Sequence, residues 1–190
     1  MNPRIVKSSF LAIIAVPALV LAADAPVSPA KGGSALSEQD VEVLAKLHHD
    51  NEMEVEMGKT AVQNGGAKQV KAFGALLVKD HTLADKQLQS YAKRRGIDLT
   101  PPAPKDQVEA AEAQAAMDGM RRLEALKGDV YDREFAKLMV EDHEKAVTMV
   151  ETTLRETSNA KVQSLLNKVL PVLKDHLKLA QQLDRQLNDT

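Results

Sequence analysis

The sequence Leu-Leu-Val-Lys-Asp-His at residues 76–81 recurs in similar form as Leu-Met-Val-Glu-Asp-His at 138–143 and as Val-Leu-Lys-Asp-His at 172–176. Each copy places an Asp-His pair inside an apolar run that has the helical period. A charged pair in apolar surroundings costs stability unless it is paired or holds an ion. Three of the five histidines in the chain belong to these copies. The interpretation of the sequence therefore depends on whether the three histidines meet in space.

The apolar pattern around the three copies predicts an all-α chain. Long amphipathic helices are expected at about 37–64, 67–95, 130–157 and 160–187, with a weaker, Ala-rich helix at about 106–126. Ser37 followed by Asp40 resembles a capping box and favours a helix start at that point. Two-residue breaks at 65–66 and 158–159 separate the helices of each pair, and Pro171 is expected to kink the last helix.

The lengths of these breaks decide the topology. Helices joined by two residues must form antiparallel hairpins, whereas the segment at 96–129 is a long crossover that carries the weaker helix. Two hairpins joined by one long crossover are typical of the ferritin-like four-helix bundle. We therefore predict an all-α, ferritin-like four-helix bundle at residues 36–190.

Counting residues from the start of each helix places the three histidines at a similar depth. His81, His143 and His176 fall near the middle of their helices, and Asn51 and Glu54 fall near the middle of the first helix. Helices of similar length share their middle level, so these residues are expected in one layer of the bundle core. Borderline divalent metals accept one carboxylate and three imidazoles as a ligand set. We therefore predict that the metal ligands are Glu54, His81, His143 and His176.

Each aspartate in the three copies points about 100° around its helix from the histidine that follows it. It can therefore reach an imidazole on an adjacent helix and hold it in place. This argument predicts supporting roles for Asp80, Asp142 and Asp175. The Glu-x-x-His pattern of di-iron centres is missing, because the residues three before the histidines are apolar, namely Val78, Val140 and Leu173. A mononuclear site for Fe, Mn, Zn or Cu fits better than a ferroxidase centre, and its expected role is metal buffering or envelope stress protection.

A second interpretation needs no metal ion. The aspartates and histidines can form a buried polar layer that only fixes the register of the helices. The protein is then a structural or interaction module of the cell envelope. The sequence contains no Gly-rich phosphate loop, nucleophile elbow or Cys-x-x-Cys motif, and it leaves open whether the protein is an enzyme. His48 and His49 are expected at the surface, and methionines such as Met139 are expected to fill the core.

The first residues predict export from the cytoplasm. Residues 1–25 have two basic residues ahead of an apolar run, followed by small residues at two cleavage positions, after Ala22 or after Ala25. This pattern is typical of a cleavable signal peptide. Residues 26–35 contain Pro and Gly and are expected to form a flexible tether. We therefore expect a periplasmic protein that has no stable membrane span after cleavage.

Composition narrows the range of partners. The formal net charge of −2 argues against nucleic acid as a partner. Aromatic residues make up 3% of the chain and Trp is absent, which leaves little to stack on bases or sugars. The chain has no Cys, so it offers no thiolate ligand. A divalent metal ion is the expected partner, and a protein partner or a homo-oligomer stays open.

Several short motifs resemble one known family. They are Met-Glu-Val-Glu-Met-Gly at 53–58, Val70 and Phe73 ahead of Leu-Val-Lys-Asp-His at 77–81, Tyr131-Asp132 with Phe135, Met-Val-Glu-Asp-His at 139–143, and Leu170-Pro171 with His176. As a set they are similar to the bacterial "predicted outer membrane protein" family, a secreted ferritin-like domain of unknown function. The resemblance covers about 36–187. It implies the bundle fold and leaves the activity open.

Overall fold

The computed structural model describes residues 36–101 and 103–188. The predicted signal peptide at 1–25 and the predicted tether at 26–35 lie outside the described residues, so they stay predictions. Among the described residues, no helix combines the length and the apolar character that crossing a membrane requires.

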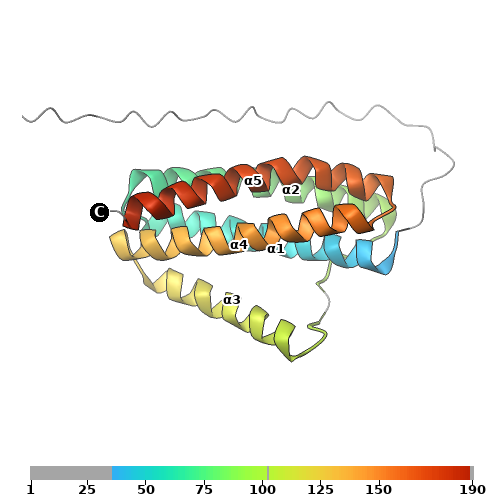
Figure 1. Ribbon diagram of the computed structural model, residues 1–190, viewed down its shortest axis with the longest axis horizontal. Coiled ribbons are helices and arrows are strands. Elements are labelled where there is room, and N and C mark those ends of the chain that lie inside the picture. The colour runs from blue at the N-terminus through green and yellow to red at the C-terminus, as the bar shows by residue number, and fades with distance from the viewer. Residues whose placement is uncertain (1–35, 102, 189–190) are drawn as a thin grey trace, which may run out of the picture. The chain divides into compact units, whose positions relative to one another are not determined.

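The described part of the chain consists of five α-helices, shown in Figure 1. They are α1 (Glu38–Asn64), α2 (Lys68–Arg95), α3 (Gln107–Ala125), α4 (Gly128–Glu156) and α5 (Ala160–Asn188). The predicted all-α fold class is confirmed, and most of the helix ends differ by only one residue from the expected ones. The largest difference is at α4, which begins at Gly128. This residue has a φ of 63°, in the left-handed region that glycine tolerates best. The helix α5 continues through Pro171.

The four long helices form two antiparallel hairpins, α1–α2 and α4–α5, which pack against each other (Figure 1). In the resulting bundle α1 lies beside α4 and α2 lies beside α5. The crossover from α2 to α4 carries α3, which runs outside the bundle and contacts α4 and α1. This connection returns the chain along the bundle, so that α4 starts near the turn of the first hairpin. The predicted ferritin-like arrangement is therefore the observed one.

Polar caps fix the ends of the bundle. The Ser37 hydroxyl accepts a hydrogen bond from the Asp40 backbone N–H, and the Asp40 carboxylate accepts one from the Ser37 backbone N–H. This is the predicted capping box. At the other end, the buried carboxylate of Asp132 in α4 accepts hydrogen bonds from the backbone N–H groups of Gly66 (2.9 Å) and Ala67 (2.7 Å). Asp132 thereby caps the start of α2 and ties the two hairpins together.

Two glycines bring α1 and α2 unusually close. A Cβ atom added at Gly74 would lie 2.6 Å from the carbonyl oxygen of Gly58 and 2.6 Å from the Cβ of Ala61. A Cβ added at Gly58 would lie 2.6 Å from the carbonyl oxygen of Gly74. Neither position has room for a side chain, so this contact sets the spacing between α1 and α2.

The apolar core is divided into two clusters along the bundle axis. One cluster lies toward the start of α2 and α4 and includes Phe73, Leu77, Tyr131, Phe135, Met139 and Leu183. The other lies toward the opposite end and includes Leu44, Leu47, Leu88, Val150, Val162 and Leu166. In α2, α4 and α5 the residue between the two clusters is a histidine. The core is therefore interrupted by a polar layer at mid-height, as the depth counting predicted.

Candidate metal centre

Three histidines from three helices converge in the polar layer. His81 of α2, His143 of α4 and His176 of α5 are buried, with exposed fractions of 6%, 1% and 1%. Their ring centroids lie 5.2 Å (His81–His176), 5.4 Å (His143–His176) and 5.9 Å (His81–His143) apart. One ring nitrogen from each histidine lies within 4.8 Å of the other two. The structure therefore brings together the three imidazoles that recur in the sequence.

A hydrogen-bond acceptor holds the other ring nitrogen of each histidine. The Nδ1 of His81 lies 2.8 Å from the Oδ1 of Asn51, and the Nδ1 of His143 lies 3.0 Å from the carbonyl oxygen of Met139. The Nε2 of His176 lies 3.2 Å from the Oδ2 of Asp80. Because each partner atom accepts, the nitrogen facing it must carry the hydrogen. The remaining nitrogen of each neutral ring then carries a lone pair.

These remaining nitrogens are buried without a partner. The Nε2 of His81, the Nε2 of His143 and the Nδ1 of His176 make no hydrogen bond within residues 36–101 and 103–188. Burial, together with the neighbouring imidazoles, lowers the pKa of His81 well below its usual value and that of His143 to about 4. Both rings are therefore neutral at pH 7. Leaving a buried polar atom unpaired costs about 1–3 kcal/mol, so this layer is expensive for the metal-free fold.

The spacing of the three nitrogens suits a metal ion after a small adjustment. An equilateral triangle with sides of 4.8 Å has its centre about 2.8 Å from each corner, whereas metal–imidazole bonds are about 2.0–2.1 Å long. Each ligand atom would therefore move inward by less than about 1 Å. Such a shift is within the reach of small side-chain rotations. Three imidazoles, each with one ring nitrogen held by an acceptor, are a common ligand set for zinc and copper.

Comparison with known sequences places the chain in a family. A family model described as a domain of unknown function, DUF4142, matches residues 25–183. The chain belongs to DUF4142. The description of the family carries no outer-membrane term, so the label expected from the resemblance is not supported. The description as a domain of unknown function agrees with the resemblance. A search of curated proteins finds no match.

Solved structures share the fold of this DUF4142 domain at low sequence identity. CopM in the Cu(I)-bound form is 16% identical with a TM-score of 0.62, and the match covers 77% of this chain and 96% of CopM. The Ag-bound form obtained by co-crystallization has a TM-score of 0.60 at the same identity and coverage. A DUF305 fragment from Deinococcus radiodurans is 16% identical with a TM-score of 0.65, covering 81% of this chain and 98% of the fragment. At this identity the comparisons establish the helical bundle alone.

Glu54 occupies a different place in this DUF4142 domain from the expected one. The group of converging nitrogens does not include Glu54. Its Oε1 lies 3.5 Å from the Nδ1 of His143, which is the nitrogen on the outer side of that ring. Burial raises the pKa of Glu54 well above its usual value, and the nearby carboxylates of Asp142 and Asp50 raise it further. Glu54 therefore lies behind His143 as a carboxyl group that favours its protonated form, and α1 instead contributes Asn51, which holds His81.

The three aspartates have three different surroundings. Asp80 reaches across to His176 on the adjacent helix α5, as predicted. Asp142 is partly buried, and burial raises its pKa to about 6, with Lys145 opposing the rise. No hydrogen bond joins Asp142 to a histidine within the described residues. Asp175 is exposed on α5, and within the same residues no hydrogen bond or ion pair joins its side chain to a histidine. Asp80 therefore lies against an imidazole of an adjacent helix, as expected, whereas Asp142 and Asp175 make no such contact within the described residues.

Two acceptors in the layer were not assigned by the sequence. Asn51 was expected at this depth, but the sequence does not show that its oxygen faces His81. The carbonyl oxygen of Met139 bonds the ring of His143, four residues further along the same helix. The second contact is local to α4, because Met139 and His143 are four residues apart on that helix.

Proposed function

We propose that this protein binds one transition-metal ion in the bundle core through His81, His143 and His176. One observation carries the proposal. Three buried imidazole nitrogens converge without hydrogen-bond partners among the residues that the structure describes, while the opposite nitrogen of each ring faces an acceptor. A polar layer that served only to set helix register would gain by pairing these atoms with one another or with the nearby carboxyl groups.

The chemistry of the ligands narrows the choice of metal. Imidazole suits Zn, Cu, Fe and Ni, whereas Mn prefers oxygen ligands. Copper comes first, because Cu(I) carries a single charge and is therefore less costly to bury among neutral ligands than a divalent ion. The likeness in fold to CopM, which has been determined with copper and with silver, supports the same choice. A nearly closed site of this kind suits metal buffering or stress protection.

The proposal is tested by metal binding of the mature, untagged protein. Wild type should take up one equivalent of Cu(I) in competition with a coloured Cu(I) chelator, and elemental analysis should find one copper ion per chain after gel filtration. His143→Ala should lose this ion. His49→Ala is the matched control, because His49 is exposed on α1, and it should bind as wild type does. If wild type retains no stoichiometric Cu(I), Zn²⁺ or Fe²⁺, the polar layer is structural and the protein is an envelope module without metal.

The proposed location is the periplasm, after cleavage of residues 1–25 or 1–22. The support is the sequence pattern of the first residues. N-terminal sequencing of the protein recovered from a periplasmic extract should begin at Ala23 or Pro26. Recovery of the intact N-terminus in the membrane fraction would show an uncleaved anchor instead.

A further inference from the structure

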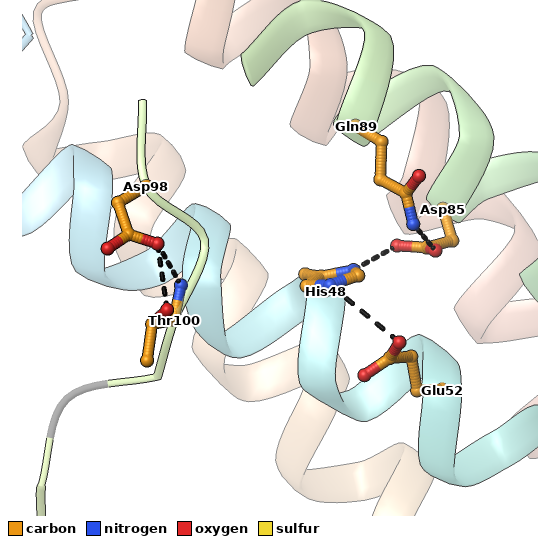
Figure 2. A network of polar contacts seen from close by, with 6 residues as sticks. All are labelled: His48, Glu52, Asp85, Gln89, Asp98 and Thr100. Atoms are coloured by element: carbon orange, nitrogen blue, oxygen red, sulfur yellow. Dashed lines mark hydrogen bonds and ion pairs between the residues drawn. The ribbon is translucent and has the colours of Figure 1, made fainter. Parts of the chain in front are cut away.

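A second cluster of polar side chains lies at the surface between α1 and α2, and Figure 2 shows it from close by. The Nδ1 of His48 lies 2.5 Å from the Oδ1 of Asp85. The other oxygen of Asp85 accepts a hydrogen bond of 2.7 Å from the Nε2 of Gln89. Asp85 is therefore held by α2 and in turn holds the His48 ring of α1. The cluster shares no residue with the buried histidine group.

The contact with Asp85 determines which nitrogen of His48 is available. A carboxylate only accepts hydrogen bonds, so the Nδ1 of His48 carries a hydrogen. In the neutral ring the lone pair is then on Nε2. This atom faces the Oε1 of Glu52 at 3.8 Å, which is too long for a hydrogen bond. A lone pair and a carboxylate oxygen thus face each other across a gap that a shared cation makes favourable.

We propose that His48 and Glu52 bind a divalent transition-metal ion at the surface, with Asp85 orienting the imidazole. A carboxylate on the far nitrogen of a ligating histidine is the usual arrangement in metal sites, where it fixes the tautomer and makes the ligand more basic. His48 and Glu52 are four residues apart, so one turn of α1 places them on the same face. The mixed nitrogen and oxygen ligands favour ions such as Zn²⁺ and Cu²⁺.

The geometry needs little adjustment to hold such an ion. With bonds of about 2.1 Å at a tetrahedral angle, the two ligand atoms lie about 3.4 Å apart. The observed 3.8 Å must therefore shorten by about 0.4 Å. The side chain of Glu52 is 61% exposed and that of His48 is 18% exposed, so Glu52 is free to move while His48 is held. A groove opens beside the pair and admits water for the remaining coordination positions; its lining includes three carboxylates and one ammonium group, namely Glu52, Glu56, Asp85 and Lys86.

Zn²⁺ titration of full-length mature protein tests the inference. Calorimetry at pH 7.5 should show a surface ion whose affinity falls at least tenfold in Glu52→Gln. Asp85→Ala should weaken it by about 10–100-fold, as is usual when a ligand loses its orienting partner. Glu56→Gln is the matched control, because Glu56 is on the same helix and lines the same groove, and its side chain is also 61% exposed. It should leave the affinity unchanged.

A second background separates this site from the buried one. The His143→Leu variant, which lacks a buried ligand, should still bind the surface ion and should lose it when Glu52→Gln is added. Its Cu²⁺ complex should show an electron paramagnetic resonance spectrum with coupling to one imidazole nitrogen. The inference is overturned if Glu52→Gln binds Zn²⁺ as wild type does, or if Glu56→Gln loses as much affinity as Glu52→Gln. In either case a proton on His48 accounts for the ion pairs in Figure 2.

Discussion

Replacing His143 by Leu should stabilise the metal-free protein and abolish binding at the buried centre. The His143 side chain is 1% exposed, and its Nε2 has no hydrogen-bond partner among the described residues. Removing an unpaired buried polar atom recovers about 1–3 kcal/mol. The substitution also loses the bond from Nδ1 to the carbonyl of Met139, worth about 1 kcal/mol. That carbonyl lies within α4 and keeps its helical hydrogen bond, so the substitution does not leave it unpaired.

The net change is an increase of up to about 2 kcal/mol in the free energy of unfolding. For a domain of this size, each kcal/mol corresponds to about 2–4 °C in Tm. Because burial lowers the pKa of His143 to about 4, the ring is neutral at pH 7.5 and the substitution removes no charge there. Leu and His are close in volume, so strain from overpacking is small.

Urea denaturation followed by the helical circular dichroism signal measures the change, at pH 7.5 with a chelator. Repeating it with Cu(I) should reverse the order of stability. An ion at 100 times its Kd stabilises wild type by about 2.7 kcal/mol and leaves the variant unchanged. The exposed His49, replaced by Leu, is the control and should change stability by less than about 0.5 kcal/mol. A His143→Leu protein that is less stable than wild type without metal would refute the reasoning, because the imidazoles would then be a satisfied polar layer.

Three further predictions concern the metal-free fold. Burial raises the pKa of Asp142 from 3.8 to about 6, so the ionised carboxylate destabilises the fold above pH 6 and the penalty disappears below about pH 4. Asp142→Asn should therefore raise the free energy of unfolding by about 1–2 kcal/mol at pH 7.5 and leave it unchanged at pH 4. An equal effect at both pH values would show that the ionised carboxylate is not the cause. Gly74→Ala should lower the free energy of unfolding, measured by thermal denaturation, by about 1–3 kcal/mol, because the added Cβ clashes with α1. In the control Gly119→Ala the added Cβ meets nothing closer than 3.8 Å, so the free energy of unfolding should rise by up to about 1 kcal/mol from helix propensity. Similar shifts at both glycines would rule out the close contact. Asp132→Ala should lower the free energy of unfolding, measured by chemical denaturation, by about 2–4 kcal/mol, because it removes two buried, charge-assisted hydrogen bonds at the start of α2. A decrease below about 1 kcal/mol would show that water replaces these bonds.

Much of the fold could be predicted from the sequence because local signals agree with the global arrangement. The capping residues Ser37 and Asp40 fix the start of α1, and the two-residue breaks at 65–66 and 158–159 leave no alternative to hairpins. The depth of the three histidines follows from counting along helices of equal length. These features depend only on neighbouring residues or on helix length, which the sequence contains directly.

The lateral arrangement in the polar layer could not be predicted in the same way. Glu54 and Asn51 lie one turn apart on α1, and counting places both near the histidines. Which of them faces which histidine depends on how α1 is rotated and how closely it approaches α2, and the contact between Gly58 and Gly74 fixes that approach. As a result Asn51 faces His81 and Glu54 lies behind His143.

The equal appearance of the three Asp-His copies was also misleading. The sequence repeats the pair, but the neighbour that each aspartate meets depends on the position of its helix in the bundle. Asp80 meets α5, whereas Asp175 on α5 is turned toward solvent. A repeated motif therefore predicts a common depth and does not predict a common partner.

The histidines of the layer come from both hairpins, since His81 belongs to the first and His143 and His176 belong to the second. An ion bound to all three would act as a reversible crosslink between the two hairpins, in addition to their apolar contacts and the hydrogen bonds of Asp132. The ion could leave only when the hairpins separate, so its residence time would depend more on the rate at which the bundle opens than on the strength of any single metal–ligand bond. Opening rates of this kind rise about 3–6-fold for each 10 °C, which would make metal release a temperature-dependent property of the whole fold.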